Sequence, residues 1–394
     1  MKVAIVHEWF DSYAGSERVV EQLLRCYPQA DLYALVDVMP DAVRGFLGGR
    51  IVHTSFIQRL PFARRHFRKY LGLMPIAVEQ FDLSGYDLVI SSSHAVAKGV
   101  ITGPGQVHVS YVHSPMRYAW DLQAQYLREA GIERGLRGVY ARWLLHRLRM
   151  WDVRTSAGVD VFLANSSHVA GRIRRVYGRT ALVVPPPVDT DAFTLGTHRG
   201  SYYLTVARFV PYKRVALTVQ AFARMPQRRL IVVGDGPGRV EVARAASGCA
   251  NIDIRAPVGR NELIALMQDA KAFVYAAEED FGITMAEAQA CGTPVIAYGV
   301  GGASDIVDVA GPDPTGVLFA EQTEAAIRNA VARFEQGRID PEACRRNALR
   351  FAEPVFADQI SAIIEKQIGL TTKPHRIHRD ARMTQNELGV LVGT

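Results

Sequence analysis

The sequence of 394 residues contains only four cysteines, and they lie far apart. Cys26, Cys249, Cys291 and Cys344 form no Cys-x-x-Cys pair, whereas a zinc site or a disulfide framework requires closer or paired spacing. We therefore expect reduced, mainly structural thiols. The chain also lacks any run of about eighteen uncharged apolar residues, so no transmembrane helix is predicted.

The first residues lack the extended apolar core of a signal peptide. Residues 1–8 include an acid, Glu8, and their pattern is typical of the first strand of a sheet. We therefore expect a cytoplasmic protein. The chain is instead rich in positive charge, with 46 Lys and Arg against 39 Asp and Glu, a net charge of +7. That excess favours an anionic partner, such as nucleic acid, a membrane surface or a phosphorylated substrate.

Apolar β-rich runs alternate with helical patterns in both halves, which predicts parallel sheets with helices on both faces. The expected strands span residues 3–6, 88–91, 107–112, 159–164, 202–206, 230–233, 272–275 and 294–297. Three consecutive prolines, Pro185 to Pro187, cannot continue a helix or a central strand and therefore mark a linker. Two doubly wound domains would leave a cleft between the carboxyl ends of their strands, where ligands usually bind.

These patterns divide the chain into three parts. We expect an N-terminal domain at residues 1–190 and a C-terminal domain at residues 198–355. A C-terminal helix and tail at residues 356–394 should pack back towards the N-terminal domain. The last part, residues 371–394, is basic and has no convincing apolar period.

Two long cations, Arg208 and Lys213, follow the expected strand 202–206 at a turn interrupted by Pro211. Arg can bind a diphosphate bidentately, and Lys adds a point charge. A solvated basic loop is an equally good interpretation of these residues alone.

A glycine turn follows the strand 230–233, beginning at Gly234. Glycine lets a ligand approach the backbone, but a structural turn is at least as good an interpretation. The residues after Pro237 do not complete Gly-x-Gly-x-x-Gly. This weakens the rival hypothesis of a nicotinamide-dependent oxidoreductase, which two Rossmann-like halves would otherwise suggest.

The most specific segment follows the strand 272–275 and opens a helix. Glu279 lies in the loop and Glu287 lies one to two turns into the helix. The backbone N–H groups near Gly282 and Ile283 would favour a phosphate at the helix start. Ionised carboxylates only accept hydrogen bonds and suit the hydroxyl groups of a ribose and a hexose. If the two glutamates stood alone, we would interpret the segment as a capped helix with a solvated acidic loop and not as a binding site.

Residues 208–213, the Glu-x7-Glu pair of Glu279 and Glu287, residues 290–297 and Gly301-Gly302 together resemble the retaining glycosyltransferases of family 4. The resemblance covers nearly the whole chain. It implies the GT-B architecture, an α/β fold of two Rossmann-like domains with an interdomain cleft, the donor bound by the C-terminal domain and the acceptor by the N-terminal one. It further implies that Arg208 and Lys213 hold the donor diphosphate, that Glu287 binds the ribose and that Glu279 binds the transferred sugar.

The resemblance and the loops together predict a donor site. Recognition of the base is expected to depend on backbone shape near residues 257–260. The predicted donor-binding residues are Gly15, Arg208, Lys213, Gly234, Val258, Phe281, Gly282, Ile283 and Glu287. The predicted catalytic residues are His113, Glu279, Arg208 and Lys213.

In the N-terminal half, Gly15 follows the first strand and starts a helix, so its backbone could approach a phosphate or the transferred sugar. Similar proteins usually carry two glycines here, and Ala14 replaces one of them. A glycine turn capped by Ser16 is the structural alternative. His113 ends an expected strand just before Pro115. The resemblance places the matching histidine beside the donor sugar, although a lone histidine is more often structural.

The run around His113 is similar to bacterial O-antigen and exopolysaccharide mannosyltransferases that use GDP-mannose. It implies transfer of mannose to a lipid-linked saccharide, with a polyprenyl diphosphate carrier, in cell-surface polysaccharide synthesis. A UDP-sugar donor is the alternative. The predicted acceptor-binding residues are His94, Lys98 and Arg117, although a capped helix start explains the serines before His94 equally well.

Residues 59–70 and 142–151 interleave basic and aromatic side chains. Such segments suit an anionic bilayer, which a lipid-linked acceptor would require. Helices that pack their aromatic side chains inward are an equal alternative. A nucleic-acid-binding protein should carry its cations in a known motif, and none occurs, so no nucleic acid partner is expected.

Asp189-Thr190-Asp191 has the Asp-x-Asp spacing that other glycosyltransferases use for manganese. It lies in the linker, away from the donor segments, and we interpret it as a turn and helix start. Members of the family that the chain resembles generally need no divalent metal. We therefore expect no cofactor besides the nucleotide-sugar.

Overall fold

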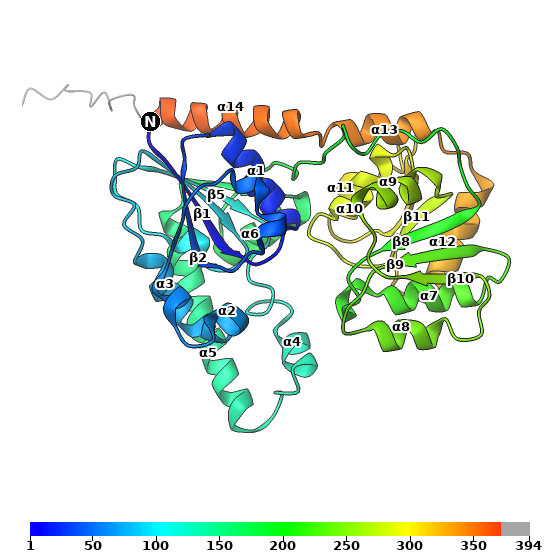
Figure 1. Ribbon diagram of the computed structural model, residues 1–394, viewed down its shortest axis with the longest axis horizontal. Helices are drawn as coiled ribbons and strands as arrows, with labels where there is room; N and C mark the ends of the chain where they lie inside the picture. The colour runs from blue at the N-terminus through cyan, green and yellow to red at the C-terminus, as the bar shows by residue number, and fades with distance from the viewer. Residues whose placement is uncertain (372–394) are drawn as a thin grey trace, which may run out of the picture.

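The computed structural model describes residues 1–371, which form two parallel sheets flanked by helices (Figure 1). The N-terminal sheet has the order β3-β2-β1-β4-β5-β6-β7. Its strands are β1 Val3–Phe10, β2 Asp31–Asp37, β3 Val52–Thr54, β4 Leu88–Ser93, β5 Val107–Val112, β6 Val161–Ala164 and β7 Ala181–Val183. The C-terminal sheet has the order β10-β9-β8-β11-β12-β13. Its strands are β8 Tyr202–Val206, β9 Arg229–Val233, β10 Ile252–Arg255, β11 Ala272–Tyr275, β12 Val295–Tyr298 and β13 Gly316–Phe319.

The strands alternate with helices along the chain. In the N-terminal half these are α1 Gly15–Cys26, α2 Ala63–His66, α3 Met74–Glu79, α4 Gln123–Glu129, α5 Gly135–Thr155 and α6 Ser167–Tyr177. The C-terminal half has α7 Val215–Ala223, α8 Arg239–Ala245, α9 Arg260–Asp269, α10 Ile283–Ala290, α11 Ala303–Ile306, α12 Glu324–Gln336, α13 Pro341–Leu349 and α14 Glu353–Thr371. Short 3-10 helices are η1 Asp41–Val43, η2 Gly45–Leu47, η3 Phe56–Arg59, η4 Phe67–Leu73, η5 Ala97–Gly99, η6 Ser156–Gly158 and η7 Pro211–Lys213.

The central strands are buried on both faces, which explains their continuous apolar runs. β4, β5 and β11 have no exposed residue, and they pair in parallel with their neighbours. All eight strands expected from the sequence are present. β2, β3, β7, β10 and β13 were not anticipated. Four of them, β3, β7, β10 and β13, are edge strands, and β3 and β7 are short and carry exposed residues.

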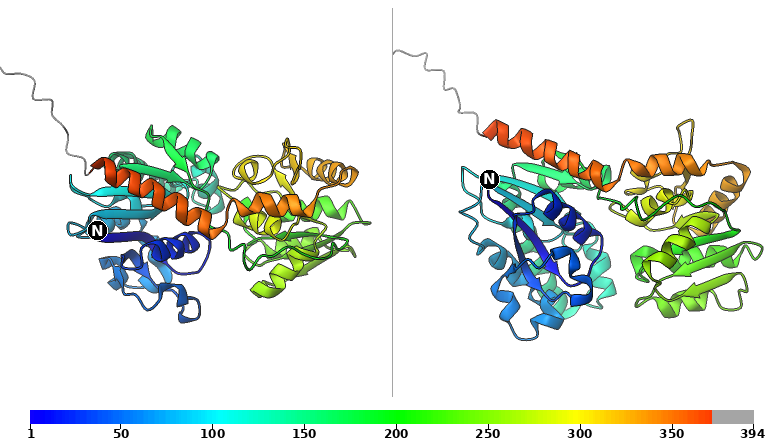
Figure 2. Two further views of the ribbon diagram at one scale, coloured as in Figure 1. Left: turned by 90° about the horizontal axis from the view of Figure 1, so that it is seen from above. Right: turned by 45° about the horizontal axis from the view of Figure 1, so that its top comes forward.

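The last helix, α14, runs from the C-terminal half across to the N-terminal half (Figures 1 and 2). Its Phe356, Ile360 and Ile364 belong to the same apolar cluster as β1 and β4 of the N-terminal sheet. Part of the expected segment 356–394, residues 372–394, lies outside the described residues. Among helices of residues 1–371, none has the length and apolar character to cross a bilayer.

The chain crosses between its halves twice, and the two crossings run beside each other. The first crossing follows Pro185 to Pro187, and the second precedes α14. Val188 N donates to Phe351 O at 2.8 Å, and Val188 pairs with Ala352 as an isolated parallel bridge. The two halves are therefore joined along one side.

Candidate functional site

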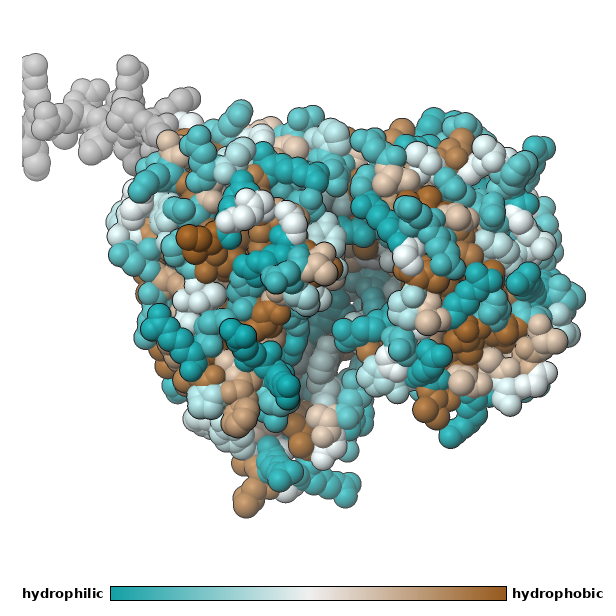
Figure 3. Space-filling model, in the orientation of Figure 1, coloured by the Kyte–Doolittle hydropathy of each residue, from teal (hydrophilic) through white to brown (hydrophobic). Residues whose placement is uncertain are grey.

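Both sheets reverse their strand order at one point, between β1 and β4 and between β8 and β11. Loops at the carboxyl ends of such strands diverge and leave a crevice. The two crevices face each other across a cavity of about 550 Å³, and Figure 3 shows the molecule hollowed between its halves. The lining residues of the N-terminal half include Gly15, Ser16, His94, His113, Ser114, Arg117, Tyr118, Tyr126 and Asn165. Those of the C-terminal half include Arg208, Tyr212, Lys213, Tyr275, Glu279, Asp280, Phe281, Gly282, Ile283 and Thr284.

A cation and a carboxylate meet on the C-terminal wall. Lys213, at the end of η7, forms an ion pair with Glu279, and Tyr275 OH donates to Glu279 Oε1 at 2.9 Å. Burial, together with the charge of Glu279, raises the pKa of Tyr275 well above its usual range, so its hydroxyl stays a donor. Arg208 is exposed to the cavity and forms no ion pair with any residue in 1–371. Within the described residues, the wall thus offers a fixed cation and a free one.

The start of α10 forms the floor between these charges. Gly282 precedes the helix with φ of 96°, a left-handed conformation that favours glycine. Gly282, Ile283 and Thr284 all line the cavity. The first N–H groups of a helix have no partner within it, so they and the helix dipole favour an anion at this place.

The glycines after β12 hold this loop and are not among the residues that line the cavity. Gly302 N donates to Glu279 O at 2.8 Å, and a Cβ at Gly301 would lie 2.3 Å from the same oxygen. From the sequence, we expected a ligand to approach the backbone of such glycine turns closely. The structure shows that the approaching group is the chain itself.

Two further donor-binding predictions do not lie at the cavity. A Cβ on Gly234 would lie 1.9 Å from Ala207 O, so this glycine lets two loops of the C-terminal domain pack together. Val258 is half-buried against the apolar core of the same domain. Neither residue is among those that line the cavity between the domains, so their placement at the donor stays a prediction.

Glu287 is buried inside α10 and points towards the N-terminal half. It is 3% exposed and forms an ion pair with Arg18 of α1. A second cross-domain pair joins Arg117 to Asp280, and Arg172 lies 3.4 Å from the other oxygen of that carboxylate. Arg18 and Asp280 were not anticipated from the sequence, because the pairs form only when the two halves face each other.

The predicted N-terminal site residues Gly15, His94, His113 and Arg117 meet at the cavity. His113 follows β5, and its Nε2 lies 2.8 Å from Ser92 Oγ on β4. Burial lowers the pKa of His113 well below its usual range, and the neighbouring His94 lowers it further, so the ring is neutral at neutral pH.

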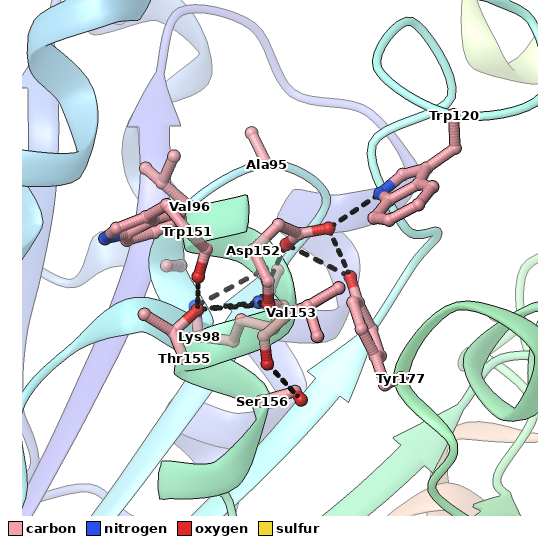
Figure 4. Close-up of polar contacts among 12 residues, drawn as sticks. Ala95, Val96, Lys98, Trp120, Trp151, Asp152, Val153, Thr155, Ser156 and Tyr177 are labelled. Atoms are coloured by element: carbon pink, nitrogen blue, oxygen red, sulfur yellow. Dashed lines mark hydrogen bonds and ion pairs between the residues drawn. The ribbon is translucent and has the colours of Figure 1, made fainter. Parts of the chain in front are cut away.

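Lys98 does not reach the cavity, which corrects its prediction as an acceptor ligand. Its side chain is 1% exposed and its Nζ lies 2.7 Å from Asp152 Oδ1, whose own side chain is fully buried. Trp120 and Tyr177 donate to the same carboxylate, so the cluster ties η5 to α5 and α6 (Figure 4). Burying both partners of an ion pair is favourable only with such additional hydrogen bonds. Lys98 is therefore structural.

The backbone between β4 and η5 also has an internal partner. Glu8, which is fully buried, accepts hydrogen bonds from the N–H groups of His94, Ala95, Val96 and Ala97 at 2.7–3.0 Å. A carboxylate of the chain thus occupies the amides that an anionic ligand could otherwise use. The side chain of His94 remains available at the cavity.

The Asp-x-Asp segment forms a turn, as the sequence indicates, but the expected helix does not start there. Asp189 Oδ1 accepts from Ala192 N at 3.0 Å, and its other oxygen pairs with Arg260. Within residues 1–371, no cluster of three or more histidine, cysteine, aspartate or glutamate residues has the arrangement of a metal site.

The geometry agrees with two family models. Residues 13–192 match the model described as Glycosyltransferase Family 4, and residues 190–351 match the one described as Glycosyl transferases group 1. The two matches together cover residues 13–351, and this part of the chain thus carries a glycosyltransferase family 4-type domain followed by a glycosyl transferases group 1 domain. The resemblance inferred from the sequence is confirmed at this level.

Curated relatives match over part of their length. The chain is 33% identical to D-inositol 3-phosphate glycosyltransferase of Geodermatophilus obscurus over 244 residues, 52% of this chain and 52% of that protein. It is 28% identical to the protein of the same name from Mycobacterium tuberculosis over 241 residues, 53% of this chain and 49% of that protein. The alignments thus span about half the length of these relatives.

Solved structures of the same fold match almost the whole chain. A crystal structure of Anabaena HepE in complex with UDP has a TM-score of 0.67 at 17% identity, covering 93% of this chain and 100% of that one. The lipopolysaccharide outer core galactosyltransferase WaaB has a TM-score of 0.62 at 16% identity, with the same coverage. At such identities the likeness concerns the fold, and it confirms the predicted GT-B architecture of two Rossmann-like domains.

Proposed function

We propose that the chain is a retaining glycosyltransferase that transfers a hexose from a nucleotide-diphosphate sugar. The observation that carries this proposal is the cavity onto which Arg208, Lys213, Glu279 and the start of α10 converge. A free guanidinium, a fixed ammonium and unpaired backbone N–H groups make up a site for a diphosphate. The carboxylate beside them suits the hydroxyl groups of a hexose.

The proposed mechanism uses this charge to stabilise the leaving group. As the bond to the anomeric carbon breaks, negative charge grows on the diphosphate, where Arg208, Lys213 and the amides of α10 are already placed. The acceptor hydroxyl attacks from the same face as the departing phosphate, which takes up the proton. His113 lies opposite Glu279 in the cavity and would position the sugar.

For the donor we keep GDP-mannose as the sequence-based proposal, with a UDP-hexose as the second candidate. The second candidate is favoured by the fold neighbour HepE, which was crystallised with UDP and with UDP-glucose. We further propose that transfer requires no divalent metal. Thermal unfolding with a panel of nucleotides distinguishes these donors.

For the acceptor we propose a phosphate-bearing molecule bound near His94 and Arg117. A polyprenyl-diphosphate-linked saccharide, as in cell-surface polysaccharide synthesis, is one candidate. The curated relatives are named for inositol 3-phosphate, which favours a small phosphorylated acceptor as the other. Transfer assays with both acceptor classes, and with Arg117→Ala, would separate them.

A lipid-linked acceptor would place the protein on the inner face of the cytoplasmic membrane. α5 exposes Leu136, Val139, Tyr140 and Trp143 beside several arginines. The other basic segment exposes Phe62 and adjoins α5, since its Phe67 belongs to the same apolar cluster as Leu145 and Leu148. Sedimentation with anionic and with neutral vesicles tests this location, and equal binding to both would contradict it.

The test of the proposed activity combines binding and turnover. Thermal unfolding is followed with GDP, GDP-mannose, UDP, UDP-glucose and NAD, with EDTA or manganese present, because a ligand that binds only the folded state raises Tm. Consumption of the stabilising donor is then measured. We expect stabilisation by one sugar nucleotide in EDTA, and loss of it in Lys213→Ala.

Lys271→Ala is the matched control for that variant. Lys271 also pairs with a glutamate of the C-terminal domain, Glu335, at 2.7 Å, but it lies outside the cavity. We expect its donor binding to equal that of the unmodified protein. Stabilisation by NAD alone, or equal loss in both lysine variants, would contradict the proposal.

A further inference from the structure

A chain of buried side chains connects His113 at the cavity with the first turn of α1. His113 Nε2 lies 2.8 Å from Ser92 Oγ, which lies 3.1 Å from His7 Nδ1. His7 Nε2 lies 3.4 Å from Glu17 Oε1. Ser92, His7 and Glu17 are 0%, 1% and 3% exposed, so water does not compete for these hydrogen bonds. His113 after β5 and residues of β4, β1 and α1 thus form one polar path through the core.

Glu17 sets the direction of the hydrogen bonds. Its second oxygen accepts from Ala14 N at 2.9 Å and from Ser16 Oγ at 3.0 Å. Burial acts to raise the pKa of Glu17, but the hydrogen bonds that its carboxylate accepts, from His7, from the backbone and from Ser16, outweigh it and help to lower the pKa to about 2. An ionised carboxylate only accepts hydrogen bonds, so His7 Nε2 must be the donor.

The remaining directions follow from the single N–H of a neutral imidazole. With its proton on Nε2, His7 Nδ1 accepts from the hydroxyl of Ser92. The oxygen of Ser92 then accepts from His113, whose proton must lie on Nε2. The Nδ1 of His113 keeps its lone pair. It has no hydrogen-bond partner among residues 1–371, while the ring lines the cavity.

We propose that Glu17 and His7 are positioning residues that fix the tautomer of His113, so that its Nδ1 accepts a hydrogen bond from a sugar hydroxyl in the cavity. This inference rests on the proposed transfer of a hexose, and it deepens that proposal by assigning the polarity of one contact. The group that binds His113 is then a hydroxyl acting as donor.

The variant Glu17→Gln should reverse the direction of every hydrogen bond between residue 17 and His113. Ala14 N–H and Ser16 O–H require an acceptor at their position, so the new amide oxygen turns to them. The amide NH₂ then faces His7 and donates to its Nε2. The proton of His7 moves to Nδ1 and donates to Ser92, which now donates to His113 Nε2. The proton of His113 therefore moves to Nδ1.

The measurement is the ¹⁵N chemical shift of the histidine ring nitrogens in ligand-free protein. It is made at about pH 8.5, above the ordinary histidine pKa of about 6.5, because a protonated His7 would also donate to Ser92. The signals are assigned by their loss in His113→Gln and His7→Gln. We expect a protonated Nε2 and a bare Nδ1 for His113, and the opposite in Glu17→Gln. A protonated Nδ1 in the unmodified protein would overturn the proposal.

Ser92→Ala is the second variant, and it interrupts the path without touching either histidine. We expect a mixture of tautomers at His113 in this variant, and no further change when Glu17→Gln is added. If Glu17→Gln still changes the tautomer of His113 in the Ser92→Ala background, the proposal is overturned. The spectra need neither donor nor acceptor. Failure of this inference and failure of the proposed transfer are therefore separate results.

Discussion

Among single residues, Gly15 allows a test of the cavity, because a substitution there should change turnover without changing the stability of the fold. It lies in the first turn of α1 with an ordinary φ, and a Cβ there would meet no atom within 4 Å. In Gly15→Val the added Cβ would meet no neighbouring atom and would take up space at the lining of the cavity. We expect the thermal midpoint to stay nearly unchanged and donor turnover to fall at least about ten-fold, because the space for the phosphate or sugar is filled.

Gly171→Val is the matched control for this prediction. Gly171 also lies on a helix, α6, and a Cβ there would likewise meet no atom within 4 Å, but this glycine does not line the cavity. Turnover of this variant should equal that of the unmodified protein. Full activity of Gly15→Val would mean that the ligand does not approach α1.

For Lys98 we predict an effect of substitution on stability and none on acceptor binding. In Lys98→Met the carboxylate of Asp152 stays buried without its cation, which should cost about 3–5 kcal/mol of unfolding free energy. Urea titration followed by tryptophan fluorescence reports on this region, because Trp9, Trp120, Trp143 and Trp151 all lie in the N-terminal half.

The pair variant Lys98→Met with Asp152→Asn should recover part of that loss, since no unpaired charge remains. For protein that is still folded, KM for the acceptor should be unchanged. A raised KM at unchanged stability would restore Lys98 to the acceptor site. Its burial could not be inferred from the sequence, because a lysine after a strand is usually solvated, and its partner Asp152 lies far along the chain, on α5.

At the scale of elements, the pairing of β4 with β5 predicts a pH dependence. His108 of β5 is buried, its Nδ1 lies 3.0 Å from Gly158 O and its Nε2 lies 2.9 Å from Ser91 Oγ on β4. Burial lowers the pKa of His108 from 6.5 to about 4. Between these values the unfolded chain binds more protons than the folded one, so stability is lost as the pH falls.

The expected loss from His108 is about 3 kcal/mol between pH 6.5 and pH 4. In His108→Gln this part of the pH dependence should disappear, even if the variant is less stable at neutral pH. Urea titrations at both pH values, followed by tryptophan fluorescence, give the change in unfolding free energy between pH 6.5 and pH 4 for each protein. The carboxylates contribute equally to this change in the unmodified protein and in His108→Gln. An equal pH difference in both would show that His108 does not titrate as the structure implies.

The elements around the cavity were largely predictable, and those at the sheet edges were not. Buried central strands such as β4, β5 and β11 carry apolar runs that identify them, and the loops after them contain the charged and glycine residues of the site. The edge strand β3 has exposed residues and no such run. The packing role of Gly234 could not be predicted, because a glycine that admits a ligand and one that admits a second loop have the same sequence pattern.

At the scale of the whole molecule, the contacts between the halves could not be predicted, because they depend on how the domains face each other. Arg18 and Glu287 are 269 residues apart and meet across the cleft. Ser167 N donates to Asp305 Oδ2 at 2.6 Å, and Arg117 pairs with Asp280. The resemblance assigned Glu287 to the ribose of the donor. In this structure its carboxylate binds the opposite domain.

Nucleotide binding and the Arg18–Glu287 pair should therefore compete for one carboxylate. If the ribose binds Glu287, it must first displace Arg18, and part of the binding free energy is lost in that exchange. Removing the competitor in Arg18→Gln should then tighten nucleotide binding about five-fold, whereas Glu287→Gln should weaken it. Isothermal titration with the nucleotide that stabilises the protein measures both.

Arg25→Gln tests whether any tightening comes from the cleft itself. Arg25 lies on the same helix and forms ion pairs with Glu21 and Glu353 at 2.6 Å, but neither partner lines the cavity. Its nucleotide affinity should not change. High salt should narrow the difference between the unmodified protein and Arg18→Gln, since salt screens the partly exposed pair. If Arg18→Gln instead weakens nucleotide binding as much as Glu287→Gln does, Arg18 is itself a ligand of the nucleotide. The approach of the two halves would then complete the donor site, whereas in the competition model the Arg18–Glu287 pair blocks it.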